Sequence, residues 1–311
     1  TLMFEAMSRG ELKALYVIGE NPADSEADVL RARALLQDLD FLIVQDIFMT
    51  KTARYADVVL PASVGWVEAD GTVTSSERRV QRVRAALVPP KGARADHEII
   101  GDLAMRLGAT WQAQTPEELW DELRSISPMH AGMSYARLEE NNGLQWPCPD
   151  LDHPGTPFLH GWLWEEDLSG HDPAPFSLTT HEGPKETLSE EFPIRLTTGR
   201  VLDSYNTGVQ SRAYKSPLRK GADLEISTVD ALELGLQNGE EVLVLSPRGQ
   251  VKMLVSIQKD QVKGLAFTTF HFPDLVDLNV LTNDEWDPLS GTAEFKAAAI
   301  RIEKLTGNDR A

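Results

Sequence analysis

The stretch FLIVQDIFMTKTARYADVVLP, residues 41–61, decides the fold predicted for the first part of this chain. It begins with four unbroken apolar residues, which is typical of a strand buried inside a sheet. The run ends on Gln45 and Asp46, and we expect a short helix over residues 50–56 and a third strand over residues 57–61. Strands that alternate with helices over short connections indicate parallel βαβ units.

The preceding residues extend this pattern. Residues 12–18 read as a strand, and the following GENP breaks it. A helix is expected over residues 25–39, with Ser25 as its N-cap and Asp28 three residues later. The side of this helix that faces the sheet would carry Val29, Leu30, Ala34 and Leu35.

Two more helices are expected before residue 130. Residues 97–108 place apolar side chains at a helical period. Residues 115–124 begin with Thr115 as N-cap, Pro116 at the first helical position and Glu118 closing a capping box. Residues 1–130 are therefore predicted to form an α/β domain.

The second half of the chain has a different character. Residues 131–190 are rich in Pro, Gly, Trp and His and read as a connecting segment. Residues 191–311 contain several strand patterns, one short helix closing on Gly235, and a hairpin turn at residues 247–249. The predicted fold class is α/β plus β, with a parallel-sheet segment followed by a closed β-barrel.

Composition excludes some functions. The chain has 311 residues and a formal charge of −18, from 30 basic and 48 acidic side chains. This balance argues against sequence-independent nucleic-acid binding, which needs many Lys and Arg residues. No apolar run is long enough to span a membrane. The single cysteine, Cys148, suits a reducing compartment, so a cytoplasmic location is expected.

The chain also starts without Met and reads like the interior of a longer protein, so we expect it to be a part of one.

The candidate site lies where the parallel strands end. Asn21, in the loop after the first strand, and Asp46, after the second, would meet at one edge of the sheet. No G-x-G-x-x-G follows either strand, so the usual NAD fingerprint is missing. A carboxylate here suits guanine, and Thr50 and Thr52 at a helix start suit phosphate. The alternative is that Asp46 only caps the helix and Thr52 is an ordinary helix residue.

Other catalytic signatures are missing from the sequence. The seven histidines form no H-x-x-x-H or H-E-x-x-H pair, and no second cysteine accompanies Cys148. No G-x-S-x-G is present, which disfavours a serine hydrolase. The basic cluster at residues 77–86 is either a surface face that anchors acidic groups or a contact for phosphate or a partner subunit.

Five stretches together resemble one family. They are VIGENP, IVQDIFMTKTARYADVVLP, EADGTVTSSERRVQ, LTTGRVLDSYNTG and LTNDEWDPLSGTAEFKAAAIRIE. In this order they resemble the C-terminal part of the molybdopterin oxidoreductases, and among these the catalytic alpha subunit of formate dehydrogenases. The resemblance extends over nearly the whole chain.

The resemblance implies a bis-molybdopterin guanine dinucleotide cofactor with molybdenum or tungsten. Residues 1–130 would be part of an α/β domain that binds it, and residues 191–311 would form a double-psi barrel that binds it too. Asp46 would hold a guanine, and Arg200 and Lys296 would contact phosphate. The full set of implied cofactor contacts is Asn21, Asp46, Thr50, Asp96, Thr198, Gly199, Arg200, Ser204, Asn206, His271, Asn279 and Lys296.

The same resemblance implies what this chain leaves out. The metal ligand, the active-site His-Arg pair and the cysteines of a 4Fe-4S cluster belong to the family's N-terminal half, so no catalytic residue or metal ligand is expected here. The family often has His or Trp where Ser204 stands. The whole enzyme would oxidise formate to CO₂ and pass electrons onward, with electron-transfer subunits as possible partners.

Three alternatives stay open. A nitrate reductase of the same family would share this half of the chain. A non-catalytic protein like the large subunit of NADH dehydrogenases would share the fold without the metal, although it would not need Asp46, Arg200 and Lys296. The third alternative is an isolated piece with no activity of its own, whatever the parent protein does.

Overall fold

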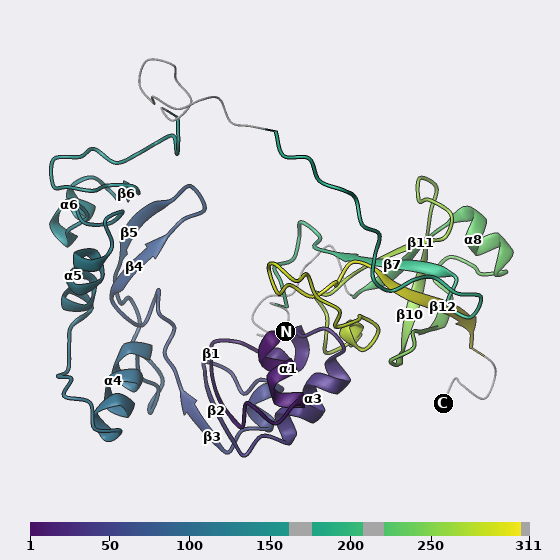
Figure 1. The fold of residues 1–311 in the computed structure, drawn as a ribbon, viewed down its shortest axis with the longest axis horizontal. Helices are drawn as coiled ribbons and strands as arrows, with labels where there is room; N and C mark the ends of the chain where they lie inside the picture. The colour runs from purple at the N-terminus through teal and green to yellow at the C-terminus, as the bar shows by residue number, and fades with distance from the viewer. Residues whose placement is uncertain (162–175, 208–220, 306–311) are drawn as a thin grey trace. The chain divides into compact units, whose positions relative to one another are not determined.

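The computed structural model describes residues 1–161, 176–207 and 221–305. The chain divides into two compact units: Thr1–Val59 with Glu182–Ala311, and Leu60–His181. The first unit therefore joins two stretches that lie far apart in the sequence (Figure 1). The three predicted domains, 1–130, 131–190 and 191–311, follow sequence order instead, and their role as cofactor-binding domains remains a proposal.

A small sheet forms the start of the first unit. Its strands are β1 (Ala14–Ile18), β2 (Phe41–Asp46) and β3 (Val58–Pro61), in that order across the sheet. Strands β1 and β2 pair in parallel, with Ala14 opposite Phe41 and Ile18 opposite Gln45. This confirms the parallel arrangement predicted from the sequence, and it brings the ends of β1 and β2 to the same edge.

The helix between β1 and β2 differs from the prediction. The chain forms α2 (Pro22–Ser25) and then α3 (Val29–Gln37), and the N-cap of α3 is Asp28, not Ser25. Asp28 has a left-handed backbone with φ of 41°, and its side chain accepts a hydrogen bond from the Arg31 N–H. A short polar side chain that tolerates this conformation caps the start of α3, two residues after the C-cap of α2 at Glu26.

The later start of α3 also turns its buried face. Val29, Ala32 and Leu36 are buried, whereas Leu30 is exposed and Leu35 is only partly buried. The predicted sheet-facing set was therefore wrong except at Val29 and, in part, Leu35. The helix expected over residues 50–56 is a single 3₁₀ turn, η1 (Thr52–Arg54). Helix α1 (Leu2–Ser8) packs Phe4 and Met7 into the same core.

A closed barrel makes up the rest of the first unit, as predicted. Around the barrel the strands follow the order β10-β8-β11-β7-β12-β9. Their bounds are β7 (Ile194–Gly199), β8 (Asp223–Ser227), β9 (Glu241–Leu245), β10 (Gln250–Gln258), β11 (Leu265–Thr269) and β12 (Ala298–Lys304). Strands β7 and β11 pair in parallel, as do β8 and β10. Inward apolar residues such as Leu196, Leu224 and Ile300 fill the interior.

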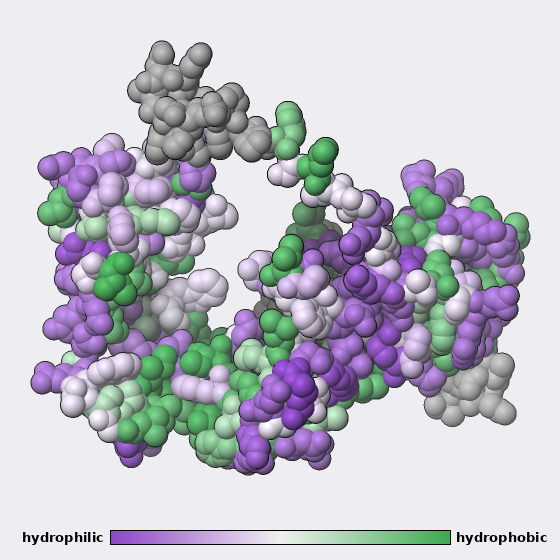
Figure 2. Space-filling view, in the orientation of Figure 1, coloured by the Kyte–Doolittle hydropathy of each residue, from purple (hydrophilic) through white to green (hydrophobic). Residues whose placement is uncertain are grey.

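Two short elements flank the barrel strands. Helix α8 (Thr228–Glu233) is capped by Ser227, and η3 (Leu278–Val280) follows β11. The hairpin turn predicted at residues 247–249 does join β9 to β10, which pair antiparallel. Hydrophilic side chains cover much of the barrel face seen in Figure 2.

The second unit holds a three-stranded sheet and three helices among the described residues. The strands are β4 (Gly71–Thr74), β5 (Arg79–Val83) and β6 (Leu144–Gln145), and the helices are α4 (Asp96–Arg106), α5 (Pro116–Ile126) and α6 (Tyr135–Glu140). The capping box of Thr115 and Glu118 at the start of α5 is confirmed. Helix α6 and strand β6 fall in the segment predicted to be a connection, because elements this short leave little periodicity in a sequence.

No helix in the described part of the chain is both long and apolar enough to cross a membrane.

Candidate functional site

The structure separates the predicted site residues into three groups. Seven lie around the ends of the barrel strands: Thr198, Gly199, Arg200, Ser204, Asn206, His271 and Lys296. Asn21, Asp46 and Thr50 lie in loops after β1 and β2. Asn279 lies in η3 and bonds the Asp24 carbonyl near the loop after β1, and Asp96 begins α4 in the second unit.

The barrel group is built on the paired ends of β7 and β11. Gly199 lies opposite Thr269 in the parallel register, so both chains leave the barrel at the same edge. Lys296 reaches this edge from the segment before β12, and its Nζ donates to the Thr198 carbonyl at 2.7 Å. A Cβ on residue 199 would come within 2.8 Å of the Phe267 ring, which explains glycine at this position.

The loop after β7 is held by its own polar groups. Arg200 Nε donates to Asn206 Oδ1 at 2.8 Å, and Asn206 has a left-handed backbone with φ of 46°. The buried His271 accepts from the Val201 N–H at 3.0 Å and bonds the Asn206 carbonyl through its other ring nitrogen. Arg200 is exposed.

Three hydroxyl groups in this region are buried with no hydrogen-bond partner among the described residues. They belong to Ser204 in the loop and to Thr268 and Thr269 at the end of β11. A buried hydroxyl without a partner costs free energy, so such groups need an explanation when they gather at one edge. Together with the cationic side chains of Arg200 and Lys296, these hydroxyls form the best candidate binding site for a polar ligand in the first unit.

The loop after β1 forms a second polar centre. Asn21 Oδ1 accepts from both the backbone N–H and the hydroxyl of Thr52, at 3.0 and 2.7 Å. Asn21 Nδ2 donates to the buried Asp24, which also receives Lys51 Nζ at 2.7 Å. Asn21 and Thr52 lie at one edge of the sheet, as expected, and they are joined by direct hydrogen bonds.

Asp46 and Thr50 stabilise local turns. The carboxylate of Asp46 accepts from the Phe48 N–H at 2.8 Å, and Thr50 Oγ1 accepts from the Ala53 N–H at 3.1 Å. Thr50 therefore provides a side-chain bond to the η1 turn. Thr52 is fully buried and bonds both Asn21 and the Ala23 N–H, so it is more than an ordinary helix residue.

Asn279 ties the two stretches of the first unit together. Its Nδ2 donates to the Asp24 carbonyl at 2.8 Å, and Lys51 Nζ also donates to the Pro273 carbonyl at 3.2 Å. The loops that carry Asn21 and Thr50 are thus fixed against the segment after β11. Asp96 is exposed at the first position of α4.

The basic cluster at residues 77–86 mainly anchors its own unit. Arg78 donates to the carbonyls of Thr156 and Pro157, and Arg82 lies over the Tyr135 ring and pairs with Glu139. The interpretation of an anchor for acidic groups therefore describes Arg82, whereas Arg78 bonds backbone carbonyls. Arg84 is exposed and pairs with Glu139 as well.

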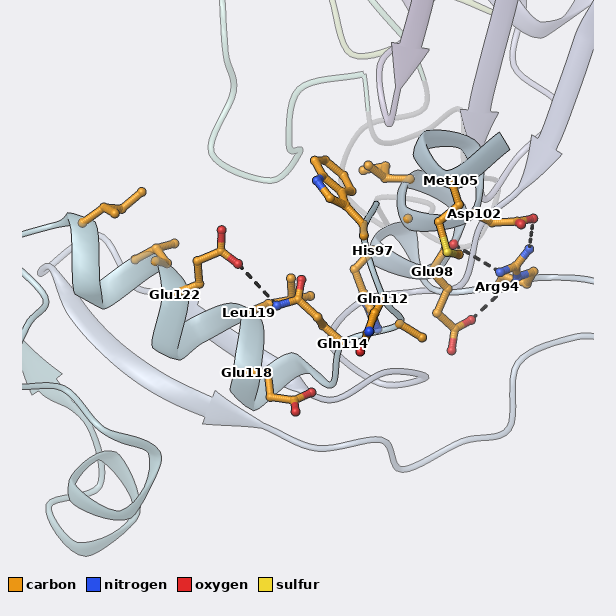
Figure 3. A pocket seen from close by; sticks show the side chains of 16 residues that line it. Arg94, His97, Glu98, Asp102, Met105, Gln112, Gln114, Glu118, Leu119 and Glu122 are labelled. Atoms are coloured by element: carbon orange, nitrogen blue, oxygen red, sulfur yellow. Dashed lines mark hydrogen bonds and ion pairs between the residues drawn. The ribbon is translucent and has the colours of Figure 1, made fainter. Parts of the chain in front are cut away.

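A pocket of about 1030 Å³ lies between α4 and α5 in the second unit (Figure 3). Polar groups of its lining bond one another: Arg94 pairs with Asp102 at 3.2 Å, and Gln114 donates to Glu122 at 3.3 Å. The hydrogen bond from Arg94 lowers the pKa of Asp102. None of the predicted cofactor contacts lines this pocket, so we do not assign the site to it.

Two family models match the chain. The model described as molybdopterin oxidoreductase matches residues 1–106, and the model described as molydopterin dinucleotide binding domain matches residues 194–299. The chain belongs to the molybdopterin oxidoreductases. The second match falls on the barrel and includes the whole group of site residues around the ends of β7 and β11.

Curated relatives of this molybdopterin oxidoreductase chain include a formate dehydrogenase subunit and a nitrate reductase subunit. It is 42% identical over 299 residues to the F420-dependent formate dehydrogenase 2 subunit alpha of Methanococcus maripaludis, over 95% of this chain and 43% of that protein. It is 34% identical over 311 residues to the assimilatory nitrate reductase catalytic subunit of Bacillus subtilis, over 96% of this chain and 43% of the relative. The chain thus spans less than half the length of these relatives.

A solved structure supports the fold. Acetylene hydratase from Pelobacter acetylenicus superposes with a TM-score of 0.67 at 19% identity, over 97% of this chain and 46% of that one. At this identity the likeness concerns the fold alone.

The barrel edge fits a molybdopterin-type group chemically. Exposed Arg200 and Lys296 suit phosphates, and the hydroxyls of Ser204, Thr268 and Thr269 suit the polar edges of a pterin. Lys296 and Arg200 each donate one hydrogen bond to a protein oxygen, and Asn21 and Lys51 are bonded to protein groups as well. Among the described residues, no group of three His, Cys, Asp or Glu side chains could hold a metal ion.

The sequence analysis missed Asp24 and Lys51. Asp24 stands inside GENPADSE as an ordinary helix-start acid, and Lys51 stands between the two threonines of the predicted site. The available signal was the proximity of Lys51 to Thr50 and Thr52. Its partner Asp24 lies 27 residues away, so only folding reveals the pair.

Proposed function

We propose that this chain is the C-terminal, cofactor-binding portion of a formate dehydrogenase-like molybdoenzyme that oxidises formate to CO₂. The observation that carries the proposal is the 42% identity to a formate dehydrogenase alpha subunit over 95% of the chain. The reaction would take place in the whole protein, and this portion would bind and orient the cofactor. The polar edge formed by the ends of β7 and β11 supports this role.

The finer features of the cofactor belong to the same proposal. The group would be bis-molybdopterin guanine dinucleotide with molybdenum or tungsten, and a 4Fe-4S cluster would lie in the N-terminal part of the parent protein. The barrel would be of the double-psi type. We further propose electron-transfer partner subunits and, from the single cysteine, a cytoplasmic location.

The residues of this chain would divide the work. Arg200 and Lys296 would neutralise the phosphates, while Thr198, Gly199, Ser204 and Asn206 would line the pterin side. Asp46 would accept from the two donors on a guanine edge, and Asn21, Thr50, Asp96 and Asn279 would shape the nucleotide loops. When bound, the cofactor supplies the two-electron chemistry.

The first experiment measures cofactor and activity in the full-length protein that contains this chain. We expect about one molybdenum or tungsten atom per polypeptide and formate-dependent reduction of an artificial electron acceptor. The relative at 34% identity makes nitrate the competing substrate. Nitrate reduction without formate oxidation would move the proposal to that alternative, and a metal-free protein would contradict the catalytic reading altogether.

A second experiment tests the phosphate contact. Replacing Lys296 with Met removes a charge-assisted contact, so we expect cofactor retention after gel filtration to fall about tenfold. Lys263→Met is the matched control, because Lys263 is an exposed barrel lysine that pairs with Glu233. Equal losses in the two variants would contradict a specific role for Lys296.

A third experiment separates two roles of Asp46. Asp46→Asn keeps an oxygen for the Phe48 N–H but removes the charge and the second acceptor that guanine needs. We expect the variant to fold normally and to lose guanine dinucleotide. The control is Asp40→Asn at the opposite, exposed end of β2. Unchanged guanine content in Asp46→Asn would leave this carboxylate with only its turn role.

A further inference from the structure

His271 is buried and uses both of its ring nitrogens within one loop. The side chain is 0% exposed and follows the end of β11 by two residues. Its Nε2 accepts from the Val201 N–H at 3.0 Å, so the ring proton is on Nδ1, which donates to the Asn206 carbonyl. The imidazole therefore connects the beginning and the end of residues 201–206.

The loop at residues 201–206 and its entrance carry the polar groups that could bind a ligand, Ser204 and Arg200. Ser204 Oγ is buried without a partner among the described residues, and Arg200 at the loop entrance is exposed. Asn206, at the other end, has a left-handed backbone, which an L-residue rarely adopts unless its surroundings hold it there. The imidazole and the bond from Arg200 Nε to Asn206 Oδ1 are the contacts that fix this conformation.

We infer that His271 is a positioning residue, which acts on the cofactor through the loop and not by touching it. It holds residues 201–206 in the shape that presents Ser204 Oγ and Arg200 at the barrel edge. Since both ring nitrogens are engaged with the loop backbone, no polar ring atom is left for a ligand. This inference rests on the proposed function and deepens it, because it assigns His271 a different task from the other predicted contacts.

Three substitutions in the full-length protein separate the two ring contacts. His271→Phe keeps a planar ring and removes both bonds. His271→Gln places an acceptor near the Nε2 position, and His271→Asn places a donor near the Nδ1 position. His130→Phe is the matched control, because His130 is a half-buried histidine of the second unit that bonds Ser127.

Two measurements are made on each variant. Amide hydrogen exchange of residues 201–206 reports the loop, and the rate of molybdopterin release, followed after oxidation by fluorescence, reports the cofactor. For His271→Phe we expect both rates to rise about tenfold, since a lost hydrogen bond changes local opening by about that factor. Gln and Asn should fall between Phe and the wild type, and His130→Phe should leave both rates unchanged.

The outcomes are distinct. If the loop exchanges faster in His271→Phe while cofactor release is unchanged, or if the loop does not loosen, the positioning role is wrong. If the wild type contains no molybdopterin, the proposed function fails instead, and the exchange data still report whether His271 holds the loop. If His271→Phe does not fold, Gln and Asn carry the test: each removes one ring contact, so exchange and release should both be faster than in the wild type, and unchanged rates in both variants would contradict the positioning role.

Discussion

The side chain of Thr52 forms two buried hydrogen bonds within the loops after β1 and β2. Its hydroxyl is fully buried, donates to Asn21 Oδ1 at 2.7 Å and accepts from the Ala23 N–H at 3.0 Å. A methyl group of similar size could fill the space but could make neither bond. The hydroxyl therefore links the predicted Asn21 loop to the segment after β2.

Thr52→Val should leave a buried N–H at Ala23 without its acceptor. We expect the free energy of unfolding to fall by about 1–3 kcal/mol, because an unsatisfied buried group keeps its full desolvation cost. Chemical denaturation of the full-length protein measures the loss. Thr228→Val, at an exposed position, is the control, and an equal effect in both variants would contradict the argument.

The carboxyl group of Asp28 makes the stability of the folded chain depend on pH. Burial raises the pKa of its carboxyl, and the nearby Asp284 raises it further. The folded state therefore binds this proton more tightly than the unfolded chain does. The resulting stability is present below the ordinary carboxyl range and is lost as the pH rises through the raised pKa.

Asp28→Asn has no carboxyl to ionise, so its stability should not fall as the pH rises through the pKa of Asp28. The substitution keeps the cap, since Asn suits both the N-cap and the left-handed backbone. The variant should match the wild type at low pH and exceed it at neutral pH by less than about 1 kcal/mol, given solvent screening of a half-buried group. Thermal unfolding across the pH range checks this, with exposed Asp40→Asn as control. A difference that does not depend on pH would rule out the carboxyl as its source.

At the scale of elements, the turn between β9 and β10 depends on one glycine. A Cβ on Gly249 would lie 2.4 Å from Val280 Cγ1 and 3.4 Å from Leu30 Cδ1. The hairpin, η3 and α3 thus approach one another at a point where only a hydrogen fits.

Gly249→Ala should force these elements apart. We expect a destabilisation of about 1–3 kcal/mol, which is typical of overpacking in a well-packed contact. Gly183→Ala is the control, because a Cβ there meets nothing within 4 Å. The midpoints of thermal unfolding would be compared, and a neutral Gly249→Ala would show that Val280 can move at little cost.

At the scale of the whole molecule, polar contacts around the buried Asp24 join the two stretches of the first unit. Asp24, with a side chain 1% exposed, pairs with Lys51 at 2.7 Å, and its carbonyl accepts from Asn279. Arg33 pairs with Asp277 at 2.6 Å across the same contact. Residues more than 250 positions apart in the sequence therefore depend on each other for stability.

Asp24→Asn should leave Lys51 without its nearest negative charge. We expect a loss on the order of 2–4 kcal/mol, together with faster amide exchange in both α2 and η3, because the substitution removes the buried carboxylate that pairs with both Lys51 and Arg33 and leaves Lys51 with only the more distant Asp274 at 3.8 Å. Asp284→Asn removes one of the two carboxylates that pair with Arg31, but this pair is about one-third exposed and Glu5 remains, so the loss should be about 1 kcal/mol or less. Equal losses would mean that burial of Asp24 is not what makes the pair important.

Local patterns in the sequence determined the elements with strong signals. The apolar run of β2, the capping box at Thr115 and the hairpin turn at residues 247–249 were all predicted, because each depends on neighbours a few residues away. The motifs also pointed to the family and to the residues around the ends of β7 and β11. The residue-level roles in cofactor binding remain predictions.

Only the tertiary structure decided the contacts between distant stretches. The sequence misplaced the N-cap of α3, because the left-handed Asp28 is held by packing that includes the Thr282 carbonyl. It could not reveal the pair of Asp24 with Lys51, nor that His271 serves the loop after β7. Periodicity and capping act over a few residues, whereas burial and long-range hydrogen bonds are set only when the barrel closes against the small sheet.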